Sequence, residues 1–181
     1  MLNDQQYDQL LDDVKKEFPD FKIVYKKDSS LMKSINFFLK TISFGKMKTF
    51  MDSFITTIGE TVYVPTDWHE NSASTKAITI RHERVHMRQA KKYGRVLFSI
   101  MYLLLPIPIG AAYFRAKFEK EAYEESLKAV HEYYGSKLFT NSLKESILKH
   151  FTTAEYIWMW PWKKSLDSWY DAAVDRIKNS K

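Results

Sequence analysis

The sequence of 181 residues contains no cysteine. This absence excludes a disulfide scaffold, a zinc site with cysteine ligands, an iron–sulfur cluster and catalysis by a thiol. Any bound metal ion must therefore have histidine, aspartate or glutamate ligands. The hydrophobic fraction of 45% and the charged fraction of 28% are typical of globular chains and argue against intrinsic disorder.

Dense runs of basic residues are also missing. The net charge of +6 comes from 28 Lys+Arg and 22 Asp+Glu, and the lysines are spread along the chain. Because a nucleic-acid-binding arm concentrates its positive charge, we expect no specific nucleic-acid partner. The N-terminal residues lack the basic start and apolar stretch of a signal peptide, so we expect a cytoplasmic protein.

Hydrophobic periodicity predicts an α+β protein with a small N-terminal sheet and a helical C-terminal half. Strands are expected at 21–26 and within 49–65, where Gly59 and Glu60 form a hairpin turn. Ser72 or Ser74 is the candidate N-cap of the central helix. The expected helices are 3–17, 31–44, 74–93, about 110–134, about 140–150 and about 164–178.

The central predicted helix carries the pattern His82-Glu83-Arg84-Val85-His86. Helical residues four positions apart are separated by about 40° around the axis, so both imidazoles project from one face and can bind one metal ion. Glu83 lies beside that line, where a carboxylate can accept the proton of a metal-bound water. We therefore predict His82 and His86 as metal ligands and Glu83 as the catalytic residue.

A catalytic zinc site needs a third protein ligand, and the helix at 110–134 offers one. At about 100° per residue, Glu119 falls at the centre of its small, apolar face, whereas Glu121 falls on the charged face. A carboxylate that points into a core requires a partner, and zinc held by the two histidines would supply it. A buried ion pair with Arg115, one turn earlier, remains the alternative.

The segment Glu119-Lys120-Glu121-Ala122-Tyr123 resembles the second motif of the gluzincin class of zinc metallopeptidases, in which a glutamate on a later helix joins the two histidines. This resemblance implies Zn²⁺ as cofactor, a peptide or protein substrate, and one zincin-like domain over 1–181. Its parts would be an αβ region at 1–70, metal-binding helices at 71–134 and a helical extension at 135–181. Thr61 to Val64 would form the edge strand along which an extended peptide binds.

Three further residues are candidates for the surroundings of the metal. Tyr123 stands where the gluzincin pattern has an acidic residue that orients a ligand histidine. Gln89 continues the histidine face of its helix, and Tyr156 is a candidate for stabilising an oxyanion, as tyrosines do in some zinc peptidases. The charged Arg84 and Arg88, together with Tyr123, depart from the usual pattern. They favour the alternative of a non-catalytic structural or binding protein, for instance in an assembly or a virion.

The segment 96–114 contains no charged residue and is long enough to cross a bilayer. A single span would separate His86 from Glu119 by about 30 Å of hydrocarbon, which is incompatible with a shared ion. Pro106, Pro108 and Gly110 also interrupt a continuous helix. We therefore expect a folded-back apolar connection, with contact of 96–109 with a membrane surface or a protein as the alternative.

Overall fold

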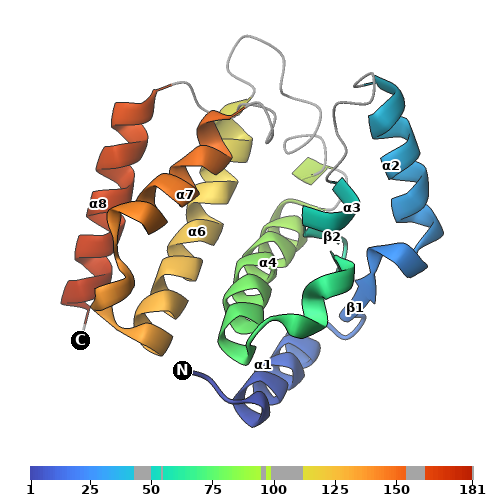
Figure 1. The fold of residues 1–181 in the computed structure, drawn as a ribbon, viewed down its shortest axis with the longest axis horizontal. Coiled ribbons are helices and arrows are strands. Elements are labelled where there is room, and N and C mark those ends of the chain that lie inside the picture. Colours follow the sequence, from blue (N-terminus) through green and yellow to red (C-terminus); the bar gives the residue numbers. More distant parts are fainter. Residues whose placement is uncertain (43–49, 54, 95–96, 99–111, 154–161, 181) are drawn as a thin grey trace. The chain divides into compact units, whose positions relative to one another are not determined.

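The computed structural model describes residues 1–42, 50–53, 55–94, 97–98, 112–153 and 162–180 (Figure 1). Helices predominate, and a three-stranded sheet accompanies them, so the broad α+β class is confirmed. The chain divides into two compact units, one of Leu2–Lys76 and one of Ala77–Lys181 with Met1. Within the described ranges no helix is both long and apolar enough to cross a membrane.

The first unit begins with helix α1 (Asp4–Glu17), which its own sequence stabilises at the N-terminus. The Asn3 side chain accepts a hydrogen bond from the Gln6 backbone, and the Gln6 side chain accepts one from the Asn3 backbone. This reciprocal capping satisfies backbone donors that the first helical turn leaves unpaired. Val14 and Phe18 turn inward and are almost fully buried, which confirms the predicted amphipathic helix.

The sheet of the first unit consists of β1 (Lys22–Tyr25), β2 (Thr56–Ile58) and β3 (Thr61–Val64), in the order β1-β3-β2. Strand β3 pairs in parallel with β1 and antiparallel with β2. The expectation that Thr61 to Val64 forms an edge strand is therefore wrong. Both sides of β3 are already hydrogen-bonded, so a peptide cannot add to it, and the edges of the sheet are β1 and β2.

The hairpin between β2 and β3 confirms the predicted turn. Gly59 has a positive φ of 61°, which glycine adopts without the steric cost of a β-carbon. The preceding β-rich stretch differs in part, because α3 (Phe50–Ser53) is helical. The buried Lys26 donates a 2.7 Å hydrogen bond to the Phe50 carbonyl and lies 3.9 Å from the centre of the Phe50 ring. Local sequence patterns do not predict this long-range contact.

Helix α2 (Ser30–Ile42) forms as predicted, but its buried face is not the stripe that apolar spacing predicts, namely Leu31, Ile35, Phe38, Leu39 and Ile42. Met32 is fully buried, whereas Leu31 is 46% exposed and Phe38 is 62% exposed. Two short 3-10 helices complete the unit, η1 (Lys26–Asp28) and η2 (Thr66–Glu70). The periodicity thus predicted the helix correctly, while packing decided which of its apolar residues became buried.

The long helix α4 (Ala73–Tyr93) begins one residue before the predicted start at 74 and ends at the predicted Tyr93. The hydroxyl of Ser72 accepts a 3.2 Å hydrogen bond from the backbone of Thr75, so Ser72 is the N-cap. Gly94 follows the last turn with a φ of 82°, a conformation that ends helices and favours glycine. The pattern from His82 to His86 therefore lies within one uninterrupted helix.

The second unit continues with α6 (Ala112–Tyr134), η4 (Ser136–Leu138), α7 (Asn141–Thr152) and α8 (Lys163–Asn179), which confirms the three helices predicted after residue 110. Figure 1 shows α7 and α8 beside α6. Their apolar faces share one hydrophobic core, which fixes α6 from one side. Its buried members are Ala116, Leu127, Ile147, Leu148, Phe151, Leu166, Tyr170, Ala173, Val174 and Ile177.

Candidate metal centre

Helix α4 presents His82 and His86 on one face, as their spacing predicts. Their ring centroids lie 5.0 Å apart, and their Nε2 atoms lie 3.2 Å apart. The side chains are 14% and 8% exposed, respectively. Two imidazoles therefore meet nitrogen to nitrogen in a largely buried position.

Helix α6 brings Glu119 to the same position. Its Oε2 lies 3.5 Å from His82 Nε2, and its Oε1 lies 3.6 Å from His86 Nε2. The carboxylate is buried, and so are four small or apolar residues on the same side of the helix, namely Ala116, Ala122, Ser126 and Val130. The three predicted ligands are thus brought together by two helices of the same compact unit.

The separations of these atoms fit a tetrahedral ion. Two nitrogen ligands at about 2.0–2.1 Å from a tetrahedral zinc lie about 3.3 Å from each other, and an oxygen ligand lies slightly farther away. The observed distances of 3.2, 3.5 and 3.6 Å are close to these values, the last two being measured to different oxygens of the carboxylate. His82, His86 and Glu119 could therefore hold a metal ion with little movement and leave a fourth position for water or substrate.

The charges of the cluster show how strongly it favours a cation. Burial by itself lowers the pKa of His86, but the charge and hydrogen bond of Glu119, the charge of Glu83 and the hydrogen bond to Gln89 together outweigh burial and raise this pKa to about 9. Burial by itself raises the pKa of Glu119, but the two histidines hold this pKa well below its ordinary value. A buried carboxylate that stays ionised between two imidazoles requires a positive charge between them, from a proton or a metal ion.

Gln89, a candidate from the sequence, contacts His86 directly. Its amide oxygen lies 2.9 Å from His86 Nδ1, and its amide nitrogen donates to the Phe118 carbonyl at 3.2 Å and to Glu121 at 2.9 Å. Because the amide oxygen can only accept, His86 Nδ1 carries a hydrogen, and Nε2 is the ring nitrogen that faces the cluster and can bind a metal ion once its own proton has left. Gln89 thus fixes the ring in the state that binds a metal.

Tyr123 approaches His82 through its ring. The two rings meet edge to face with centroids 4.8 Å apart, and Tyr123 also packs against His150 and Phe151, each at 5.5 Å. The hydrogen-bond partner of His82 Nδ1 is Ser126, whose Oγ lies at 3.1 Å. The tyrosine therefore packs against the ring that an acidic residue would orient by a hydrogen bond in the gluzincin pattern.

The sequence indicated no role for His150, which is half-buried beside this aromatic pair. Its Nδ1 donates to the Ser146 carbonyl at 2.9 Å, and burial lowers the pKa of the ring. The charges of Glu119 and His82 also act on His150, so its ring lies within electrostatic range of the cluster. His150 is therefore a neutral imidazole near the candidate centre.

Glu83 is buried at 8% exposure beside the two histidines. Its negative charge contributes to the raised pKa of His86, so its carboxylate is close to that ring. Of the two arginines that depart from the gluzincin pattern, Arg84 is half-buried and Arg88 is exposed. Tyr156 lies outside the described residues, as does the segment 96–109 apart from residues 97 and 98.

Arg81, immediately before the first histidine, joins α4 to α6. Its guanidinium donates to Glu125, Glu132 and the Tyr133 hydroxyl. The bond from Nε to Glu125 is 2.8 Å long, and the arginine side chain is only 17% exposed. We call these contacts the Arg81 clamp. They hold together the two helices that carry the candidate ligands.

Three of these contributors were missed by reasoning from the sequence: Arg81, Ser126 and Glu121. A usable signal existed for Ser126, because it lies seven residues after Glu119 and therefore on the same helical face. Arg81 and Glu121 gave no such signal. Each lies on a charged face, and only the packing of α4 against α6 brings it to its partner.

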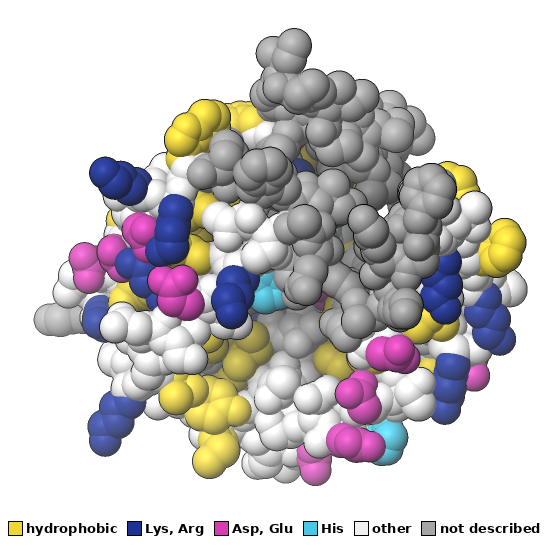
Figure 2. Space-filling view, turned by 45° about the horizontal axis from the view of Figure 1, so that its top comes forward, with side chains coloured by type: hydrophobic (Ala, Val, Ile, Leu, Met, Phe, Trp, Pro, Cys, Tyr) yellow, Lys and Arg dark blue, Asp and Glu magenta, His cyan; other side chains and the backbone are white. Residues whose placement is uncertain are grey.

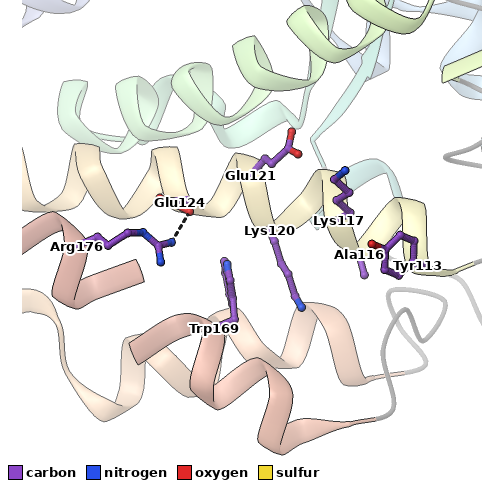
Figure 3. A pocket seen from close by; sticks show the side chains of 8 residues that line it. All are labelled: Tyr113, Ala116, Lys117, Lys120, Glu121, Glu124, Trp169 and Arg176. Atoms are coloured by element: carbon purple, nitrogen blue, oxygen red, sulfur yellow. Dashed lines mark hydrogen bonds and ion pairs between the residues drawn. The ribbon is translucent and has the colours of Figure 1, made fainter. Parts of the chain in front are cut away.

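A cavity of about 280 Å³ lies elsewhere on the second unit, and Lys117, Arg176 and Trp169 are among its lining residues. Figure 3 shows Lys120 of α6 pointing toward α8, where Trp169 lies, whereas Glu121 points the other way. The lining contains none of the three candidate ligands.

On the face shown in Figure 2, lysine and arginine side chains lie among acidic ones.

Comparisons of the chain with models of protein families, with curated proteins and with solved structures found no match.

Proposed function

We propose that the protein is a zinc-dependent metallopeptidase with a zincin-like fold, and that its centre corresponds to that of the gluzincins. The observation that carries the proposal is the convergence of His82 Nε2, His86 Nε2 and the Glu119 carboxylate in a buried place, at separations suited to a tetrahedral ion. Two imidazoles and one carboxylate form a ligand set typical of catalytic zinc.

Bound zinc would supply a Lewis acid that polarises a peptide carbonyl and lowers the pKa of water. Glu83 would accept the proton of the attacking water and deliver it to the leaving amine. Its buried position next to His86 supports this role. Gln89 would keep His86 oriented during the reaction, and the substrate would be a peptide or protein.

Metal analysis of the purified protein tests the first half of the proposal. We expect about one zinc per chain, lost in a variant that combines His82→Ala with His86→Ala. His69→Ala combined with His131→Ala is the matched control, because these histidines make contacts outside the cluster. Zinc that persists unchanged in the first double variant would refute the site.

Cleavage of a peptide library tests the second half. We expect zinc-dependent cuts by the wild type and none by Glu83→Gln, while that variant keeps its zinc. The glutamine is nearly isosteric but cannot accept the proton. Equal cleavage by both proteins would remove Glu83 from the mechanism.

A non-catalytic structural or binding protein with a stabilising ion is the second candidate function. The observation that favours it is the packing of Tyr123 against His82, where a peptidase of this class uses an acidic orienting group. Such a protein would bind zinc but yield no cuts in the library. The two experiments together separate the candidates.

A further inference from the structure

Ser126, a residue of the second unit, makes a contact that bears on which ring nitrogen of His82 carries the hydrogen. It lies on α6, two turns after Glu119, and is 8% exposed. Its hydroxyl donates to the Ala122 carbonyl at 3.2 Å and lies 3.1 Å from His82 Nδ1. A serine hydroxyl has one hydrogen, which is already directed at Ala122, so toward His82 the oxygen acts as an acceptor.

This direction fixes the tautomer of the ring. His82 Nδ1 must carry the hydrogen that Ser126 accepts, and Nε2 must present its lone pair toward His86 and Glu119. Gln89 accepts from His86 Nδ1 in the same way, so that Nε2 is the nitrogen of that ring available to a metal ion. Both rings are therefore oriented for metal binding by neutral groups, a hydroxyl from α6 and an amide from α4.

We infer that Ser126 is a positioning residue of the metal centre, which holds His82 in the ligating tautomer through the chain of hydrogen bonds from His82 Nδ1 to Ser126 and on to the Ala122 carbonyl. The inference rests on the metal site of the proposed function, and it does not require peptidase activity. A hydroxyl adds no negative charge, so Ser126 orients the ring without making it as strong a ligand as an acidic partner would. Ser126 therefore has the role of orienting a ligand histidine, which the gluzincin pattern assigns to the position of Tyr123.

The test measures zinc affinity by competition with a chelator in four proteins: wild type, Ser126→Ala, Ser126→Thr and Ser168→Ala. We expect Ser126→Ala to weaken zinc binding by about 10–100-fold, the usual effect of losing an orienting partner. Ser126→Thr keeps the hydroxyl and should restore affinity to within about threefold of wild type. Ser168 donates to the Lys164 carbonyl in the same way but is exposed and on α8, so its substitution should change nothing.

A spectroscopic readout distinguishes positioning from a general structural effect. In the zinc-loaded wild type, nuclear magnetic resonance should show His82 bound through Nε2, with a hydrogen on Nδ1 that exchanges slowly with water. In Ser126→Ala that hydrogen should exchange faster, while the corresponding hydrogen of His86 stays protected by Gln89.

Each outcome has a distinct meaning. A wild type that binds no zinc would overturn both the metal site and this inference. A wild type and a Ser126→Ala variant with equal zinc affinity and equal protection of the His82 hydrogen would overturn the inference and leave the metal site intact. Failure of Ser126→Thr to restore affinity would show that volume, and not the hydroxyl, matters at this position.

Discussion

Arg81 Nε donates a 2.8 Å hydrogen bond to Glu125 Oε1, and this contact joins α4 to α6 one residue before the first candidate ligand. The position of the clamp couples helix packing to the metal centre. A change in the clamp should therefore affect both the stability of the fold and the affinity for the ion.

We predict that Arg81→Met lowers the free energy of unfolding by about 1–3 kcal/mol, because it leaves partly buried acceptors without their donor. Denaturant unfolding measures the loss, and zinc affinity should fall in the same variant. Arg176→Met is the control, because the Arg176–Glu124 pair also joins two helices but its arginine side chain is 58% exposed. Exposed pairs contribute at most about 1 kcal/mol, so equal losses in the two variants would contradict the clamp.

Zinc binding should depend on pH in a defined direction. Without the ion, burial lowers the pKa of His86, but Glu119, Glu83 and Gln89 together raise it to about 9, so at neutral pH a proton is bound where the metal would bind. Zinc must displace that proton, and the apparent affinity should rise about tenfold per pH unit up to about pH 9. Calorimetry in two buffers of different ionisation enthalpy should detect about one proton released per zinc at pH 7, and a pH-independent affinity would refute this coupling.

Tyr123 should act through its ring and not through its hydroxyl. Tyr123→Phe keeps the packing against His82, His150 and Phe151, so we expect zinc affinity and stability close to wild type. Tyr123→Ala removes a half-buried ring and should destabilise the protein, by less than the about 3–5 kcal/mol typical of a fully buried aromatic residue. Thermal unfolding and zinc titration measure both effects. A large loss of zinc affinity in Tyr123→Phe would show that the hydroxyl matters.

The hairpin of the first unit provides a test of the fold. Gly59→Ala places a β-carbon at a φ of 61° and should cost about 1–2 kcal/mol of stability. Gly59→Asn should cost less, because asparagine tolerates this conformation better than other residues with a side chain. Denaturant midpoints of the three proteins measure the order, and equal stabilities would place the turn in another conformation.

The sequence was a sufficient guide wherever the determining interactions are local. The spacing of apolar residues, the capping residues Asn3 and Ser72, and the glycine at 94 determine helix ends through contacts within a few positions. The hairpin at Gly59 is equally local. The metal cluster was predictable because its two histidines are four residues apart and Glu119 is the one acidic residue at the centre of an otherwise small, apolar helix face.

Short segments were enough to predict the main helices, the hairpin and the candidate ligands, because helical periodicity and residue chemistry are local properties. Contacts between distant segments were needed to establish that β3 is central, that Leu31 and Phe38 stay exposed, and that Ser126 lies against His82. Each of these depends on which distant segment packs against a given face. Local patterns do not distinguish which apolar face or strand edge becomes buried, and packing between elements makes that choice.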